Sequence, residues 1–273
     1  FPAGMTLNSD GSSGTCPGVT ATSGANSFSI ANGTAIPAGG CTVIVDVTSS
    51  TAGSATNTIA AGDLQTSAGD NADPTSATLN IYAAPTVTKT FTPTTIAPGG
   101  TSSMVITVTN PADNPGNLTG VAISDSYAGT LVNNAVGSVN CSGGGSATLT
   151  GGVNGGTTVG FNSGTIVPGG TCTITQSVSA TSTVTNSTGA PTATGPVALT
   201  GTAAGPITLT VSDLPTITQS FAVSDLASGS NTGLTVTIGN TNGSAITLSS
   251  LFTNSFPAGM TLNSDGSSGT CPG

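Results

Sequence analysis

The stretch PTVTKTFTPTTIAPGGTSSMVITVTNP, at residues 85–111, decides the fold class. Val, Ile and Thr alternate with other residues in two runs, and a turn rich in Pro and Gly separates these runs. Alternation with a period of two is typical of β-strands that bury one face. The pattern recurs in CTVIVDVTS from Cys41 and TCTITQSVS from Thr171, and no long stretch has the 3.6-residue period of a helix. The sequence therefore predicts an all-β protein.

The chain repeats itself on two scales, and repeats have to be identified before any fold is assigned. Residues 1–18, FPAGMTLNSDGSSGTCPG, recur unchanged at residues 256–273, which indicates a tandem repeat with a period of 255 residues. Within this period, residues 85–111 are similar to PTITQSFAVSDLASGSNTGLTVTIGNT, which begins at Pro215. The sequence therefore predicts two diverged modules in each repeat.

We expect one complete module at residues 85–214 and two parts of its sibling. The C-terminal part of the sibling lies at residues 1–84, and the N-terminal part of the next sibling lies at residues 215–273. Many short strands in about 130 residues suit an immunoglobulin-like β-sandwich. Both termini look like cuts through a longer polypeptide, and no signal peptide is recognisable.

The charge of the chain excludes several classes of partner. It has one Lys or Arg, ten Asp or Glu and no His, which gives a formal net charge of −9. Binding to nucleic acid or to an anionic membrane surface requires basic residues, so we expect neither partner. We also expect no membrane insertion, because no apolar run approaches the length that spans a bilayer.

Four Cys residues belong to one period, because Cys271 is the repeat copy of Cys16. No His is present and no Cys pair has the close spacing of a zinc site. The sequence therefore predicts one disulfide per module, Cys16–Cys41 and Cys141–Cys172, and an unpaired Cys271. Disulfides indicate an oxidising compartment.

The motifs SDSYAG, IVPGGTCTI and TNTIAAGDLQTSAGDNADPTSATLNI, together with residues 85–111, resemble immunoglobulin-like surface-repeat domains of very long secreted prokaryotic proteins. The resemblance implies an extracellular or cell-surface repeat protein, a stalk or a fibre, with neighbouring repeats of the same protein as partners. It implies no enzyme activity and no cofactor.

The single lysine, Lys89, is replaced by Gln219 in the sibling, and Asp125 is replaced there by Asn254. This joint replacement indicates that the two side chains meet. One hypothesis, drawn from pilin and adhesin domains that this chain resembles, is an intramolecular isopeptide bond. Lys89 would be the amine, Asp125 the acid and Asn186 the amide, with Asn110 and Asn117 as alternatives to Asn186.

Two alternatives to this bond stay open: a buried Lys89–Asp125 ion pair, matched in the sibling by a Gln219–Asn254 hydrogen bond, or an exposed lysine without a special role. Asn57 occupies the position of Asn186 in the sibling, which has no Lys, and this favours a structural role for the Asn.

A weaker candidate is a calcium site at GDNADP, where Asp70, Asn71 and Asp73 lie close together in sequence. No acidic partner lies nearby, so a solvated turn is the favoured interpretation. Without His, Ser-His-Asp catalysis is excluded. The Asp residues are scattered through turns, so we expect no pair of converging carboxylates of the kind that hydrolyses glycosides.

The sequence therefore predicts a structural segment of a giant extracellular filament, with stiff Pro-containing linkers and little for trypsin-like proteases to cleave. The alternative is the repeat region of a cell-surface adhesin whose ligand site lies on this segment or beyond it.

Overall fold

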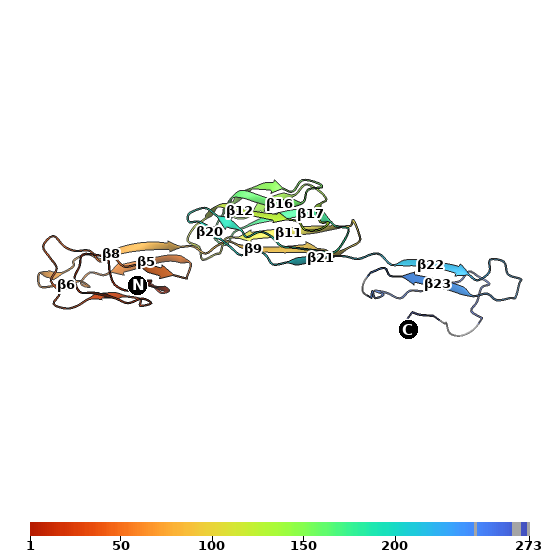
Figure 1. Cartoon of the computed structure of the whole chain (residues 1–273), viewed down its shortest axis with the longest axis horizontal. Helices are drawn as coiled ribbons and strands as arrows, with labels where there is room; N and C mark the ends of the chain where they lie inside the picture. The colour runs from red at the N-terminus through yellow and green to blue at the C-terminus, as the bar shows by residue number, and fades with distance from the viewer. Residues whose placement is uncertain (243–244, 264–268, 272–273) are drawn as a thin grey trace. The chain divides into compact units, whose positions relative to one another are not determined.

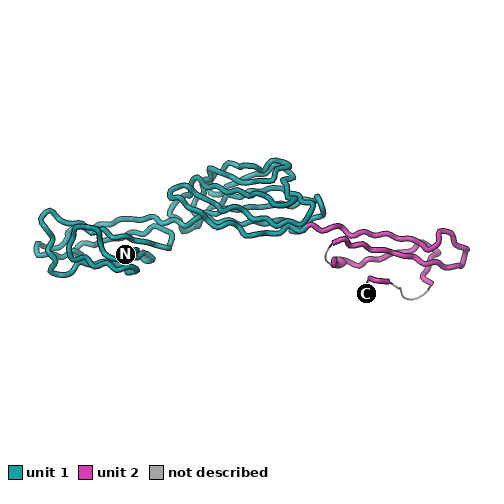
Figure 2. The backbone as a smooth tube through the Cα atoms, in the orientation of Figure 1, with its two compact units in different colours: residues 1–210 teal, residues 211–273 magenta. Residues whose placement is uncertain are grey.

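The computed structural model describes residues 1–242, 245–263 and 269–271. The chain forms two compact units, Phe1–Thr210 and Val211–Gly273 (Figure 2). Strands are the regular elements of the described residues, and among these residues no helix is long and apolar enough to cross a membrane. The prediction of an all-β fold is confirmed. The proposed module boundary between residues 84 and 85 is not tested by the division into units and stays a prediction.

Residues 1–81 form a set of two-stranded antiparallel sheets, in which β1 pairs with β4, β2 with β3, β5 with β8 and β6 with β7. Figure 1 shows β8 alongside β5. The strands are β1 (Met5–Leu7), β2 (Val19–Ala21), β3 (Phe28–Ile30), β4 (Val47–Ser49), β5 (Gly53–Ile59), β6 (Gln65–Thr66), β7 (Gly69–Asp70) and β8 (Thr75–Ile81).

Residues 86–211 form a β-sandwich of three sheets. One sheet has the order β13-β17-β11-β9, with β14 also paired to β17; the second is β15-β16-β12-β19-β20, and the third is β10-β21-β18. The strands are β9 (Thr86–Thr92), β10 (Thr95–Ile96), β11 (Thr101–Thr109), β12 (Leu118–Ser126), β13 (Val132–Asn133), β14 (Ser138–Cys141), β15 (Ser146–Gly151), β16 (Thr158–Ile166), β17 (Thr171–Ser179), β18 (Val184–Asn186), β19 (Thr192–Ala193), β20 (Leu199–Thr200) and β21 (Ile207–Val211).

The alternation read from the sequence sets the core of this sandwich. On β11, Met104, Ile106 and Val108 are buried, whereas the residues between them are half-buried. Antiparallel pairing places Ile106 opposite Ile174 of β17, another fully buried residue. Because side chains of a strand alternate between its faces, one face of each sheet fills the interior and the Thr-rich face meets solvent.

In the described part of the second unit, β22 (Thr216–Phe221) and β23 (Leu234–Gly239) form a hairpin. Its apolar side chains are largely uncovered. Phe221 of β22 is 46% exposed, whereas Phe91, its counterpart on β9, is 3% exposed. The hairpin therefore has the pattern of a sandwich strand pair, and no second layer covers it among the residues that the structure describes.

The duplicated segment shows what a missing layer does. Met5 and Leu7 lie on β1, pair with β4 and are 5% and 1% exposed. The identical residues Met260 and Leu262 are 41% and 78% exposed. The same sequence is therefore buried in one place and uncovered in the other, because burial requires a partner strand as well as a local pattern.

Two disulfides join the Cys pairs that the spacing predicts, Cys16–Cys41 and Cys141–Cys172. Cys141 lies directly opposite Cys172 in the pairing of β14 with β17. Cys271 is a free, exposed thiol. The Cys141–Cys172 bond thus ties β14 to β17, whereas Cys16 and Cys41 lie outside the strands of residues 1–81.

We predict that the Cys141→Ser/Cys172→Ser double variant loses about 3–4 kcal/mol of unfolding free energy, because the open chain regains the conformational entropy that the bond removes. Chemical denaturation followed by circular dichroism measures the loss. The matched control is Cys271→Ser, which removes an exposed thiol and leaves the transition unchanged. An unchanged transition in the double variant would contradict the prediction.

Candidate functional site

Three polar side chains from three different sheets meet inside the sandwich. Lys89 lies on β9, Asp125 on β12 and Asn186 on β18. The Nζ of Lys89 donates to Oδ2 of Asp125 at 2.6 Å, and Nδ2 of Asn186 donates to Oδ1 of the same carboxylate at 2.7 Å. Asp125 is fully buried, and Lys89 and Asn186 are each 3% exposed. One carboxylate therefore holds both an amine and an amide.

Side chains alternate between the two faces of each strand, and this alternation places all three residues on the inward face. Lys89 shares the inward face of β9 with the buried Phe91, and Asp125 follows the buried Ile123 two residues along β12. Asn186 stands in the same relation to Val184 on β18. Each polar side chain occupies a position that an aliphatic residue would fill in an ordinary strand.

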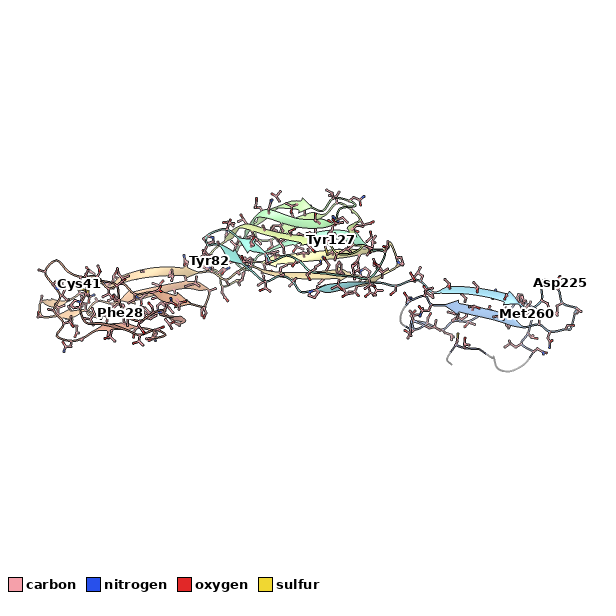
Figure 3. All side chains as sticks on the ribbon, viewed as in Figure 1. Phe28, Cys41, Tyr82, Tyr127, Asp225 and Met260 are labelled. Atoms are coloured by element: carbon pink, nitrogen blue, oxygen red, sulfur yellow. A yellow bond between two sulfur atoms is a disulfide. The ribbon has the colours of Figure 1, made fainter. Side chains whose placement is uncertain are left out.

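Burial controls the electrostatics of the site. It lowers the pKa of Lys89, and the hydrogen bond and the charge of Asp125 act in the opposite direction. The lysine Nζ also lies 5.3 Å from the centre of the Phe91 ring. Nearby, burial raises the pKa of Tyr127, an effect that the charge of Asp125 increases, and the Tyr127 hydroxyl donates to Asn133 at 2.6 Å. Figure 3 shows Tyr127 among the strands of this sandwich.

The sibling positions carry amides in place of the charges. Nδ2 of Asn254 donates to Oε1 of Gln219 at 3.4 Å, and the pair is exposed to solvent. Asn57, the counterpart of Asn186, is half-buried on β5. The hydrogen bond between the two amides is the one expected for the sibling if Lys89 and Asp125 meet.

The other two Asn candidates for the site lie elsewhere. Asn110 is buried, but its Nδ2 donates to the carbonyl of Ile166 at 2.8 Å. Asn117 is exposed. Of the three amides considered from the sequence, Asn186 alone contacts Asp125 in the described residues.

The residues of the weak calcium candidate form a turn. Oδ1 of Asn71 accepts from the backbone N–H of Leu64, and its Nδ2 donates to the carbonyls of Ala60 and Asp73. The Asn71 side chain is thus engaged with backbone groups. Among the described residues, no group of three or more His, Cys, Asp or Glu side chains could hold a metal ion.

One feature of the site region was not identified from the sequence. Asn114 is buried and binds the backbone of the preceding linker twice. Its Oδ1 accepts from the N–H of Ala83 at 2.6 Å, and its Nδ2 donates to the carbonyl of Ala83 at 2.9 Å. We call this two-bond contact the linker clamp.

The second unit has the same linker clamp. Oδ1 of Asn242 accepts from the N–H of Asp213 at 2.7 Å, and Nδ2 of Asn242 donates to the Asp213 carbonyl at 3.0 Å. Ala83 and Asp213 each stand two residues before a Pro-Thr pair, at residues 85–86 and 215–216. The signal in the sequence is an Asn shortly after each second strand, which is weak in a chain so rich in Asn.

We predict that Asp125→Ala destabilises the sandwich by about 3–5 kcal/mol, because Lys89 is left buried without its carboxylate. The Lys89→Gln/Asp125→Asn double variant, which copies the sibling amides, loses much less than the sum of the single variants. Denaturation of all four chains gives the coupling energy. Additive losses would show that the pair does not act as a unit.

Comparison with known proteins gives a family and two distant structural likenesses. The chain has a TM-score of 0.38 and 12% identity to BcpA, the major pilin subunit of Bacillus cereus, over 65% of this chain and 52% of the pilin. For a single-residue variant of BcpA, the TM-score is 0.39 and the sequence identity is 10%, over 64% of this chain and 52% of the variant. The chain thus spans about half the length of these pilin chains, and values this low carry no functional conclusion.

No protein with a curated description matches the chain. The model of one protein family, described as "Domain of unknown function (DUF7933)", matches residues 1–81 and again residues 85–211. The chain therefore belongs to the DUF7933 family.

Proposed function

We propose that this chain is a structural segment of an extracellular surface fibre, built from tandem β-sandwich modules that transmit tension along a long polypeptide. The modules would be 85–214 and the sibling whose parts lie at 1–84 and 215–273. Support comes from the exact repeat of residues 1–18, from the family match to both 1–81 and 85–211, and from two disulfides, which suit an oxidising extracellular setting.

The observation that carries this proposal is the position of the buried triad between the strands that tension would load. The linkers continue into β9 at one end of the sandwich and into β21 at the other. Lys89 lies on β9, and Asn186 lies on β18, the strand paired with β21. A link between Lys89 and Asn186 would therefore join the first loaded strand to the neighbour of the last, and most of the sandwich would be relieved of the force.

We propose that this link becomes covalent, as an isopeptide bond. A proton passes along the hydrogen bond from Lys89 to Asp125, which leaves a neutral amine and a carboxylic acid. After the Asn186 amide turns over, the acid donates to its Oδ1 while the Lys89 Nζ attacks Cγ. The new C–N bond forms, the Cγ–Nδ2 bond breaks, and Nδ2 leaves as ammonia with the second amine proton. As the carbonyl re-forms, the proton on Oδ1 returns to Asp125, which ends the reaction as the neutral acid and holds the proton that Lys89 first gave up.

Intact mass tests the bond. The chain is expected to be lighter by one ammonia, and a protease that cleaves at aromatic residues should release a branched peptide containing residues 89 and 186. Lys89→Gln is the matched control, because it keeps a polar side chain and removes the amine. A full, unreduced mass for the parent chain would refute the cross-link and leave a buried ion pair.

Single-molecule stretching of a tandem polypeptide tests the mechanical role itself. If Lys89 and Asn186 are joined, unfolding of module 85–214 releases less chain than its length allows, because the residues between the two positions stay in a closed loop. Lys89→Gln restores the full extension. Electron microscopy of the same material should show threads with a period of two modules; dispersed globules would contradict the fibre proposal.

We propose that the linker clamps stiffen the connections between modules. A backbone segment held through both its N–H and its carbonyl by one side chain cannot rotate freely about its own dihedral angles. The linkers also contain Pro and almost no Gly, a composition of semi-rigid spacers. The clamps at Ala83 and Asp213 would thus orient each linker against the module that follows it.

We predict that Asn114→Ala speeds hydrogen exchange at the Ala83 amide, because this N–H loses the acceptor that shields it. NMR-detected exchange on the full chain measures the change. Asn117→Ala is the matched control, since Asn117 is an exposed Asn in the same loop. Equal exchange rates in the two variants would show that the contact does not restrain the linker.

A further inference from the structure

We infer that two copies of this chain pack laterally against each other through one outward sheet face of the sandwich at residues 86–211. The face belongs to the sheet that contains β9, β11 and β17. We call it the hydroxyl face, because its side chains are almost all Thr and Ser. This inference deepens the proposed function by naming a lateral partner, and it rests on that function for the arrangement of modules in a fibre.

The hydroxyl face consists of the residues that alternate with the core residues on three neighbouring strands. On β9 these outward residues are Thr86, Thr88, Thr90 and Thr92, which are all exposed. On β11 and β17 they are also Thr or Ser, with Val105 as the one exception. Side chains of a strand point alternately to its two faces, so these residues form one continuous surface.

Strand pairing aligns the hydroxyl groups in rows across the sheet. Thr107 of β11 lies opposite Thr173 of β17 on one side and opposite Thr88 of β9 on the other. The Oγ1 atoms of Thr107 and Thr173 are 3.3 Å apart, within hydrogen-bond distance. The pairing runs without a register shift along both neighbours of β11. With strands about 4.8 Å apart and outward residues ~7 Å apart along a strand, the hydroxyl groups form a regular lattice.

The outward face of the opposite sheet is irregular. The register between β12 and β16 shifts twice, and Gly120 and Ser163 on these strands have positive φ values of 59° and 53°. Bulges of this kind bend a strand and increase its twist. Of the two five-stranded sheets that the structure describes, the one with β9, β11 and β17 therefore presents the regular outward lattice.

The hydroxyl face lies on a part of the chain that is almost free of charge. Lys89, Asp113 and Asp125 are the charged residues of the sandwich, and Lys89 and Asp125 form the buried ion pair. Asp113 lies in the loop between β11 and β12, so no charged residue stands on the hydroxyl face. A low net charge removes the repulsion that keeps acidic proteins apart. Two copies therefore approach each other here with less repulsion than elsewhere on the chain.

The hydroxyl face is complementary to itself. A hydroxyl group donates one hydrogen bond, accepts two and rotates to suit its partner. Two such faces related by a two-fold axis can therefore pair hydroxyl with hydroxyl, which a face of carboxylates alone could not do. Each Thr also carries a methyl group, and Val105 lies on the central strand, so the contact removes apolar surface from water as well. Sheets that pack face to face in this way lie about 10 Å apart.

A second copy is the partner that this chemistry selects. A charged partner would find no opposite charge on the hydroxyl face, and a sugar chain would find no aromatic ring to stack on. A second copy presents the same lattice with the same spacings. A contact between identical faces is closed by its two-fold symmetry, so the chain is expected to form dimers.

In the proposed fibre, this contact would hold neighbouring threads in register. The segments assigned to the sibling module, 1–84 and 215–255, carry several Asp and no Lys or Arg. These segments would repel their equivalents on a neighbouring thread, whereas the nearly neutral sandwiches would pair. The lateral contacts would thus recur once in every 255-residue period.

Sedimentation velocity of the 273-residue chain over a range of concentrations tests the inference. Every chain carries Cys271→Ser, so that no disulfide can join two copies through this exposed thiol. We expect the parent to shift from monomer to dimer as its concentration rises. Thr107→Asp should stay monomeric over the same range, because two carboxylates would meet in the contact. Thr148→Asp is the matched control: Thr148 is exposed on β15 in the opposite sheet, so the dimer should persist.

A second variant and the salt dependence keep the test decisive. Thr107 is half-buried, whereas Thr88 in the same row is exposed, so Thr88→Asp should preserve the fold, as judged by circular dichroism, and still prevent the dimer. Added sodium chloride should increase the dimer fraction, because salt screens the repulsion between the acidic segments.

Four results would overturn the inference: a parent that is monomeric at every concentration, a Thr88→Asp chain that dimerises like the parent, an equal loss of dimer in Thr148→Asp, or a dimer that salt dissociates. None of these results bears on the intact mass or on the stretching of a single polypeptide. The proposed function therefore fails or stands separately.

Discussion

The structure depends on a constraint around its one basic side chain. An unpaired buried ammonium group would cost more free energy than a module of this size can spare, so Lys89 requires a carboxylate at hydrogen-bond distance. Asp125 meets that need at 2.6 Å and uses its second oxygen to hold Asn186. Because these residues come from three sheets, satisfying the lysine also fixes how the sheets lie on one another. A slip of one residue on β9 would turn Lys89 to solvent and leave Asp125 buried without it.

The strands, the disulfides and the Lys89–Asp125 contact could be predicted from the sequence, because each leaves a pattern that is local or that occurs twice in the chain. The alternation of Val, Ile and Thr gave the strands, and the two Cys pairs matched across the modules. The joint loss of Lys89 and Asp125 in the sibling pointed to their contact, since a residue pair that is replaced together in an internal repeat behaves like a natural double variant. Asn186 was less certain, because the sequence offered Asn110 and Asn117 as well, and only tertiary packing separates these three amides.

Other features could not be predicted, for reasons that are equally physical. The linker clamp of Asn114 on Ala83 joins a loop to a backbone segment, and neither partner carries a periodic signal. The two copies of residues 1–18 show the limit most clearly: Met5 is buried and Met260 is exposed although their local sequences are identical. Strand formation depends on cross-strand neighbours, so a local pattern fixes which face would be buried and leaves open whether a partner is present.

In the proposed fibre, the two modules of a repeat would therefore differ in how they resist force. Residues 86–211 hold the buried Lys89–Asp125 pair beside the Asn186 amide, whereas the sibling module, as proposed, would carry amides at all three positions. Amides need no counter-charge, so the proposed sibling would open without leaving a buried ion unpaired, but it would also have no amine with which to form a permanent link. A fibre that alternates the two kinds would combine units that keep their length with units that can extend and close again. The joint replacement of Lys89 and Asp125 in the sibling is consistent with such a division of mechanical roles inside one repeat. Replacing the lysine alone would have left Asp125 buried without its counter-charge.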